Sequence, residues 1–115
     1  MEIKLVTLEG CSRCEKAKEI FTKEGIRYHF TTCEEDPQNC DNLEALIDEI
    51  AYPMILLTNS SGTIFEILYI TDSYNKLKVG AKNKDGILCI PNHSIDNMLL
   101  YVKNKLNLNK WEADN

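Results

Sequence analysis

The chain has little of what marks disordered, fibrous and membrane-spanning proteins. Three prolines and five glycines are spread over 115 residues, and no apolar run approaches the roughly 18 residues that cross a membrane. Positive charge is also scarce, because 13 Lys and Arg residues stand against 18 Asp and Glu residues and give a net charge of −5. We therefore expect neither a membrane nor a nucleic acid as partner, since nucleic-acid binding depends on neutralising phosphates.

Cysteine is too sparse for a disulfide scaffold, since the chain has five cysteines, an odd number. A chain of 115 residues buries roughly two-thirds of its extended surface on folding, and its 43% apolar content supplies the core of one domain. The chain passes from Met1 directly into a charged, alternating strand pattern, so we expect no secretory leader. We expect a cytoplasmic monomer in a reducing compartment, where paired cysteines are more often catalytic or metal-binding than structural.

Hydrophobic periodicity predicts an α/β fold with the element order β-α-β-α-β-β-α. The expected strands are residues 2–8, 26–31, 54–58 and 63–70, and the expected helices end near Gly25, span 42–50 and begin at Ser94. Asp41 and Glu44 have the spacing of a capping box for the second helix. Strands joined by a helix should be parallel, so the carboxyl ends of the first two strands share one edge of the sheet.

The expected domain covers residues 1–106 and is followed by a tail over 107–115. An insertion at 72–92 precedes the last helix, and its apolar runs predict an added hairpin that turns at Asp85-Gly86. The insertion is locally basic through four lysines, Lys76, Lys78, Lys82 and Lys84. These lysines fit either a docking site for an acidic partner or a solvated hairpin whose charges discourage edge pairing.

The most informative motif is Cys11-Ser12-Arg13-Cys14, at the junction of the first strand and the first helix. Two thiols three residues apart at a helix start lie on one turn, within reach of a disulfide. The free N–H groups of the helix start and the Arg13 cation favour the thiolate of Cys11, which is the reactive form. The motif predicts thiol–disulfide exchange, in which Cys11 attacks and Cys14 resolves the mixed disulfide. Two incidental cysteines and half of a zinc site are the alternatives.

The remaining three cysteines are open to several interpretations. Cys33 and Cys40 bracket an acidic loop, and Cys33 is expected at the same sheet edge as Cys11. The pair fits a second dithiol that exchanges electrons with the first, a regulatory disulfide, a four-cysteine zinc site with Cys11 and Cys14, or two reduced thiols. Structural zinc prefers short spacing in both pairs, so the six residues between Cys33 and Cys40 fit zinc poorly. Cys89 is expected to be a small buried apolar residue.

Three features of the chain, taken in order, resemble the glutaredoxin family of the thioredoxin fold. They are the cysteine motif after the first strand, Tyr52-Pro53 before the third strand, and Ser94-Ile95-Asp96-Asn97 at the start of the last helix. The resemblance covers residues 1–106 in element order. It implies a mixed central sheet flanked by helices.

The resemblance also assigns binding residues. It implies a cis peptide bond between Tyr52 and Pro53, beside the cysteine motif, with the Tyr52 backbone free to pair with an extended thiol substrate. It implies that amides at the start of the last helix hold a carboxylate of glutathione and that an acidic side chain holds its ammonium group. Asp96 and Asn97 fall on the two Asp positions of the family. The simpler alternative is that Ser94 is only an N-cap and Asp96 a surface residue.

The expected function is therefore that of a glutathione-linked thiol–disulfide oxidoreductase, an enzyme that reduces protein or mixed disulfides with glutathione as co-substrate. The expected binding residues are Arg13, Tyr52, Pro53, Ser94, Asp96 and Asn97, and no resident metal ion is expected. One alternative is a thioredoxin-like reductase fed by a flavoprotein, although the chain lacks the Trp-Cys-Gly-Pro-Cys motif of that branch. Another is an iron–sulfur or zinc carrier, because glutaredoxins with serine at the position of Ser12 include a group that holds a [2Fe–2S] cluster between two chains.

Overall fold

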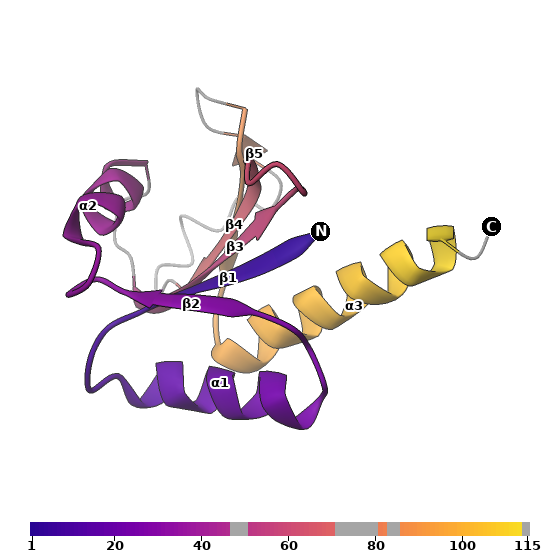
Figure 1. The fold of residues 1–115 in the computed structure, drawn as a ribbon, viewed down its shortest axis with the longest axis horizontal. Coiled ribbons are helices and arrows are strands. Elements are labelled where there is room, and N and C mark those ends of the chain that lie inside the picture. Colours follow the sequence, from indigo (N-terminus) through magenta and orange to yellow (C-terminus); the bar gives the residue numbers. More distant parts are fainter. Residues whose placement is uncertain (47–50, 71–80, 83–85, 114–115) are drawn as a thin grey trace.

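A computed structural model describes residues 1–46, 51–70, 81–82 and 86–113 of the chain. The predicted α/β fold, a mixed central sheet flanked by helices, is confirmed (Figure 1). Within the described ranges the elements are β1 (Glu2–Thr7), α1 (Ser12–Lys23), β2 (His29–Thr32), α2 (Pro37–Leu46), β3 (Ala51–Thr58), β4 (Ile64–Ile70), β5 (Ala81–Lys82), β6 (Leu88–Asn92) and α3 (Ile95–Ala113).

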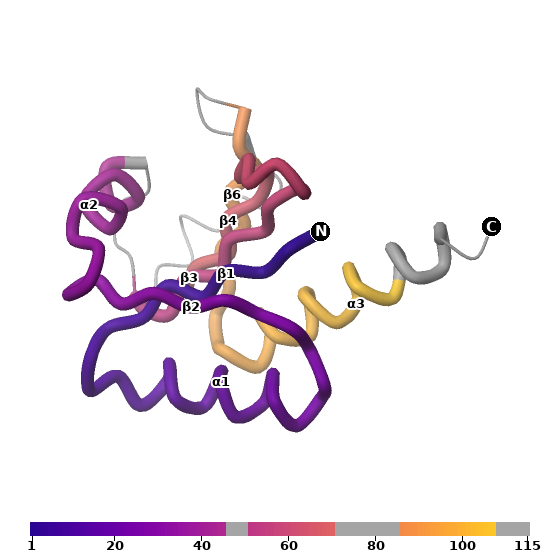
Figure 2. The backbone as a smooth tube through the Cα atoms, viewed as in Figure 1, coloured from indigo at the N-terminus to yellow at the C-terminus, as the bar shows by residue number. Residues whose placement is uncertain are grey.

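The described strands form a sheet in the order β2-β1-β3-β4-β6-β5. β1 and β2 are parallel, as predicted, and β3 is antiparallel to both of its neighbours, β1 and β4. β6 is parallel to β4, and the short β5 is antiparallel to β6. As a result β1, β2, β4 and β6 all end at one edge of the sheet, which is also the edge where β3 begins (Figure 2). We call this edge the carboxyl edge.

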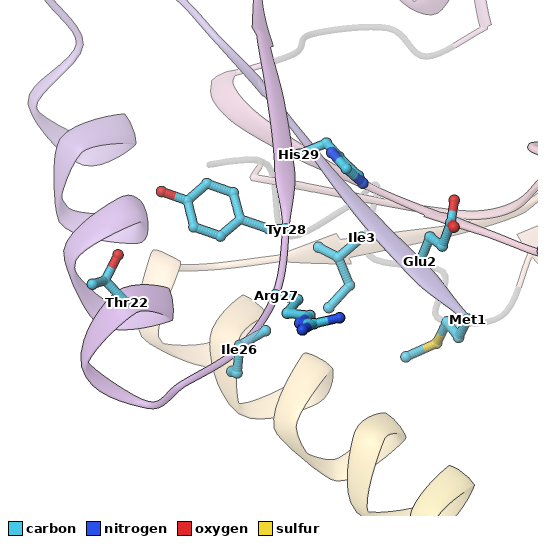
Figure 3. A pocket seen from close by; sticks show the side chains of 8 residues that line it. All are labelled: Met1, Glu2, Ile3, Thr22, Ile26, Arg27, Tyr28 and His29. Atoms are coloured by element: carbon cyan, nitrogen blue, oxygen red, sulfur yellow. The ribbon is translucent and has the colours of Figure 1, made fainter.

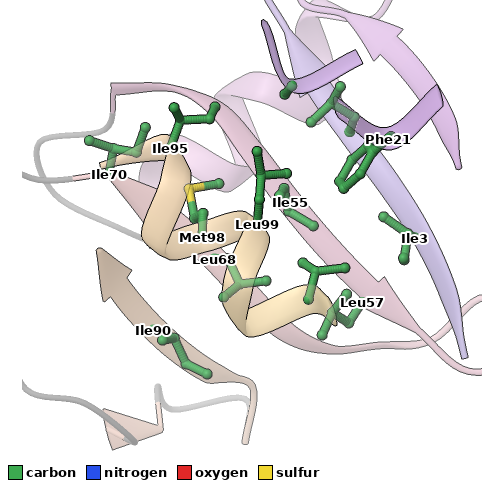
Figure 4. Close-up of a cluster of buried hydrophobic side chains, with 13 residues drawn as sticks. Ile3, Phe21, Ile55, Leu57, Leu68, Ile70, Ile90, Ile95, Met98 and Leu99 are labelled. Atoms are coloured by element: carbon green, nitrogen blue, oxygen red, sulfur yellow. The ribbon is translucent and has the colours of Figure 1, made fainter. Parts of the chain in front are cut away.

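Helices α1 and α3 cover one face of the sheet and enclose the larger core (Figures 1 and 4). Phe21 of α1 and Met98 of α3 are fully buried there against strand residues such as Ile55 and Leu68. A side chain of this size contributes roughly 1.5–3 kcal/mol to stability by leaving water. The apolar residues of α3 that face this core are Ile95, Met98, Leu99, Val102 and Leu106.

Helix α2 lies over the opposite face and covers a smaller core (Figure 1). Its buried side chains are Val6, Cys14, Cys40, Leu43, Tyr52, Met54, Leu56 and Ile67. Cys11, Cys33 and Cys89 are half-buried and pack against the same cluster. All five cysteines of the chain therefore share one apolar layer, which we call the cysteine layer.

The start of α2 differs from the prediction. The helix begins at Pro37, so Asp41 and Glu44 do not form a capping box at its N-terminus. Asp36 holds that place instead, because its carboxylate accepts a hydrogen bond from the backbone N–H of Asn39 at 3.3 Å. Pro37 suits the first helical position, where its missing N–H group has no intrahelical partner to lose. Residues 47–50, the predicted end of this helix, lie outside the described ranges.

The second strand also begins later than predicted. β2 starts at His29, and its Phe30 is 53% exposed, although phenylalanine is usually buried. The Phe30 ring instead lies 4.2 Å from the Lys18 ammonium and packs against Tyr28. Lys18 thus covers an apolar ring at the edge of the sheet.

The region before α3 is built into the sheet. The short β5 is antiparallel to β6, and β6 also extends the sheet by pairing with β4. Residues 71–80 and 83–85, which include most of the predicted hairpin, lie outside the described ranges. Of the four lysines of the insertion, only Lys82 lies within the described residues. The helix α3 continues to Ala113, so residues 107–113 of the expected tail are helical. None of the helices in the described ranges has both the length and the apolar character that a membrane span requires.

Polar contacts hold the second half of the packed segment of α3. Glu66 of β4 is 4% exposed, and its carboxylate accepts a hydrogen bond from the Tyr101 hydroxyl and an ion pair from Lys105, both at 2.9 Å. Burial and the bond to Glu66 raise the pKa of the Tyr101 hydroxyl. Lys103 pairs with Glu24 at the end of α1, at 3.4 Å. A buried carboxylate needs such partners, because an unpaired one is costly to remove from water.

Replacing Tyr101 by Phe should lower the free energy of unfolding by about 1.5 kcal/mol, since it removes a hydrogen bond to a buried charged group. The urea unfolding midpoint measures this loss. Tyr28→Phe is the matched control, because the Tyr28 hydroxyl makes no hydrogen bond within the described residues and its removal should change stability by less than about 0.5 kcal/mol. Equal effects of the two variants would contradict the role of the Tyr101 hydroxyl.

Candidate active site

The carboxyl edge of the sheet collects the residues that the sequence singled out. Cys11 follows β1 and Cys33 follows β2, so the predicted sharing of one edge by these two cysteines is confirmed. Tyr52 lies in the first residues of β3, and Ser94 follows β6, which ends at the same edge because it is parallel to β4. Residues from four separate segments therefore meet at one side of the molecule.

Cys11 is the N-cap residue of α1. Its backbone is extended, with φ −84° and ψ 110°, and its Sγ accepts a hydrogen bond from the backbone N–H of Cys14 at 3.2 Å. This N–H is one of the free donors of the helix start, a position that favours negative charge. The sulfur of Cys11 thus takes the place that a serine or aspartate oxygen usually takes at a helix N-cap.

Cys11 and Cys14 are joined by a disulfide, with their Cα atoms 5.2 Å apart. The two sulfurs differ in accessibility, because Cys11 is half-buried whereas Cys14 is fully buried in the cysteine layer. An external thiol or disulfide can therefore approach Cys11 but not Cys14. This asymmetry fits one cysteine that reacts with substrates and a second that reacts only with the first.

The Tyr52-Pro53 peptide bond is cis, as the resemblance implied. The carbonyl oxygen of Tyr52 lies 3.9 Å from Cys11 Sγ, so the backbone just before Pro53 faces the reactive sulfur. The register between β3 and β4 shifts between Ala51 and Ile55, which is where Pro53 cannot donate a ladder hydrogen bond. The Tyr52 backbone is thus the part of this residue that borders the disulfide.

The Tyr52 side chain is buried in the cysteine layer and is 7% exposed. Its hydroxyl donates a hydrogen bond of 2.8 Å to the Glu44 carboxylate on α2. Burial and this bond raise the pKa of the Tyr52 hydroxyl, and the nearby carboxylates of Asp41 and Glu34 add to the effect. Tyr52 therefore remains a neutral donor that connects α2 to the cis-proline segment.

Glu44 is the supporting residue that the sequence analysis misassigned. We expected it to cap a helix, and the structure places it within α2, where it accepts the Tyr52 hydrogen bond. The dipeptide Asp36-Pro37 was the signal for the earlier helix start. The partnership with Tyr52 itself has no local sequence signal, because it joins a helix to a strand.

At the start of α3, Ser94 is the predicted cap. Its hydroxyl accepts a hydrogen bond from the Asn97 N–H at 3.3 Å. Asp96 is exposed and forms an ion pair of 3.3 Å with Lys16 of α1. Within the described part of the chain, no hydrogen bond or ion pair connects this turn to Cys11 or the Tyr52 segment. Arg13 is also exposed and makes no ion pair to any described residue.

Cys33 and Cys40 are joined by a second disulfide, with Cα atoms 5.6 Å apart. Among the interpretations of this pair, the structure therefore favours a disulfide over two reduced thiols or zinc ligands. Within the described ranges, no group of three or more His, Cys, Asp or Glu side chains is arranged to hold a metal ion. Iron and zinc bind thiolates, so only a reduced form of these cysteines is suited to a metal or a cluster.

A separate hollow of about 730 Å³ lies at the opposite edge of the sheet (Figure 3). Met1 and Ile3 of the β1 segment line it, together with Thr22 of α1 and the Ile26–His29 segment that leads into β2. None of the five cysteines lines this hollow, and we do not assign the candidate chemistry to it.

Comparison with known protein families gave a match to the first half of the chain. The model of the glutaredoxin family matches residues 3–60, which is half of the 115 residues. The matched segment contains both disulfides and the Tyr52-Pro53 bond, whereas β6 and the start of α3 lie beyond it. The searches of curated proteins and of solved structures gave no match.

The reduced protein should react with limiting iodoacetamide at Cys11 well before Cys14, because Cys11 is the accessible member of this pair and its thiolate accepts a hydrogen bond from a helix N–H. Peptide mass spectrometry after short reaction times measures the order. Unfolding in urea should remove the difference, which provides the control. Modification of Cys14 at the same rate in the folded protein would contradict the assigned asymmetry.

Proposed function

The chain belongs to the glutaredoxin family, and from this premise we propose that it is a glutathione-linked thiol–disulfide oxidoreductase that reduces protein disulfides or mixed disulfides. The observation that carries the proposal is the pairing of a half-exposed Cys11 at a helix N-cap with a fully buried Cys14. A nucleophile must be reachable, and a resolving thiol must be reachable only by its partner.

In the proposed reaction the reduced Cys11 thiolate attacks one sulfur of the substrate disulfide. The substrate disulfide breaks, its second sulfur leaves as a thiolate and takes a proton, and a mixed disulfide forms on Cys11. Cys14 then attacks Cys11 Sγ, forms the Cys11–Cys14 disulfide and releases the first substrate sulfur as a thiol. The Cys14 N–H stabilises Cys11 whenever it is a thiolate, both before attack and when it is displaced from a mixed disulfide.

The substrate backbone is proposed to lie along the Tyr52-Pro53 segment. The Tyr52 carbonyl is 3.9 Å from Cys11 Sγ, so an extended chain beside it would bring its own cysteine to the reactive sulfur. The hydrogen bond between the Tyr52 hydroxyl and Glu44 connects this segment to α2 and holds it in place. Two glutathione molecules would then reduce the Cys11–Cys14 disulfide and yield oxidised glutathione, which closes the cycle.

A glutathione-coupled assay of two substrates, a small glutathione mixed disulfide and a protein disulfide, tests the assignment. Cys11→Ser should abolish both activities, because it removes the attacking sulfur. Cys14→Ser should keep activity on the mixed disulfide and lose it on the protein disulfide, because only the latter needs an internal resolving thiol. Cys89→Ser is the control and should match the wild type. Full activity of Cys11→Ser on either substrate would overturn the proposed function.

The start of α3 is proposed to bind the γ-glutamyl group, with Asp96 accepting its ammonium. Asp96→Asn should raise the KM for a glutathione mixed disulfide about fivefold, the effect of losing an exposed charge pair of about 1 kcal/mol, with little change in kcat. Lys16→Gln should not raise KM, because it frees Asp96 for the ligand. If Asp96 served only the ion pair with Lys16, the two variants would behave alike.

A further inference from the structure

The second disulfide repeats the asymmetry of the first. Cys33 is half-buried whereas Cys40 is 4% exposed, just as Cys11 is half-buried and Cys14 fully buried. Each pair therefore presents one sulfur that other groups can reach and one that they cannot. In both pairs the accessible sulfur belongs to the cysteine that follows a strand at the carboxyl edge.

The backbones of the two accessible cysteines, Cys11 and Cys33, are hydrogen-bonded to the carbonyl groups of two neighbouring residues. The Cys33 N–H donates to the carbonyl of Thr7 at 3.0 Å, and the Cys11 N–H donates to the carbonyl of Leu8 at 3.3 Å. The loops are joined again where the Glu9 N–H contacts the Glu34 carboxylate at 3.3 Å. The segment that leads from β1 to Cys11 is thus fixed against the segment that contains Cys33.

The buried cysteines of the two disulfides also lie in the same apolar cluster. Cys14 and Cys40 belong to one buried cluster, and Cys11 and Cys33 pack against it. Among residues 37–45 of α2, for which burial is described, only Cys40 and Leu43 are buried, so the second disulfide is a principal attachment of this helix to the sheet. Exchange between the pairs would occur at the rim of the cysteine layer.

We propose that Cys33–Cys40 is a second redox site, which accepts two electrons from the reduced Cys11–Cys14 pair of the same molecule. The Cys11 thiolate attacks Cys33 Sγ, the Cys33–Cys40 bond breaks, and Cys40 leaves as a thiolate that takes a proton. Cys14 then attacks Cys11, the Cys11–Cys14 disulfide forms, and Cys33 is released as a thiol. One dithiol is oxidised and the other disulfide is reduced, so electrons and atoms balance.

The Cys14→Ser variant traps this step, because it lacks the thiol that would resolve a bond between Cys11 and Cys33. The variant is prepared with Cys33–Cys40 oxidised and Cys11 free, in a Cys89→Ser background, then quenched in acid and digested without reduction. Mass spectrometry should detect a Cys11–Cys33 linked peptide that forms at a rate independent of protein concentration. The matched control is Cys11→Ser, whose free Cys14 is buried and should give no link to Cys33.

The inference rests on the proposed function only for the reactivity of Cys11, and the same samples separate the two. Each variant is also assayed with a glutathione mixed disulfide. If Cys14→Ser is active in that assay but forms no Cys11–Cys33 link, or forms it only between molecules, the second redox site is overturned and the proposed function stands. If Cys14→Ser is inactive in that assay and forms no link, the proposed function itself fails.

A kinetic comparison provides a second measurement, in which the wild type starts with both disulfides formed. With limiting glutathione, the Cys33–Cys40 disulfide of the wild type should be reduced at least about tenfold faster than that of Cys11→Ser/Cys14→Ser, since a linked thiol has a high effective concentration. Alkylation of Cys33 and Cys40 over time gives both rates. Equal rates would overturn the proposal.

Discussion

The hydrogen bond from the Cys14 N–H to Cys11 Sγ fixes the position on which the rest of the site depends. The Cys11 sulfur both caps helix α1 and carries the candidate chemistry. Moving this sulfur would therefore break the hydrogen bond that caps the helix. The other parts of the edge are arranged around it. The Tyr52 carbonyl faces it, Cys14 lies behind it, and the segment that contains Cys33 is hydrogen-bonded beside it.

Local sequence patterns correctly predicted the elements whose positions depend on neighbouring residues. The cysteine motif after a buried strand and the Ser94 cap each appear where they were expected. The start of α2 was not predicted correctly, because Asp36-Pro37 and the Asp41–Glu44 pair both carry N-terminal signals and tertiary contacts choose between them. Burial of Cys40 and its bond to Cys33 require a helix that begins before Cys40.

The contacts between distant segments lay beyond sequence reasoning. No periodicity indicates that β6 pairs with β4 in parallel, although this pairing brings the start of α3 to the carboxyl edge. The exposure of Phe30 also has no local sequence signal, because an edge strand can place an aromatic ring against the stem and charge of a neighbouring lysine rather than in the core. Glu44 found its partner in a strand, which a helix pattern cannot reveal.

The two ion pairs between α1 and α3 have opposite polarity along the helices. Lys16 of α1 meets Asp96 near the start of α3, and Glu24 after α1 meets Lys103 further along α3. Each pair is exposed and adds little stability by itself. Together they distinguish directions, because docking α3 upside down would set Lys16 against Lys103 and Glu24 against Asp96. Repulsion between like charges would then oppose the reversed arrangement. The apolar face of α3 alone would not exclude it.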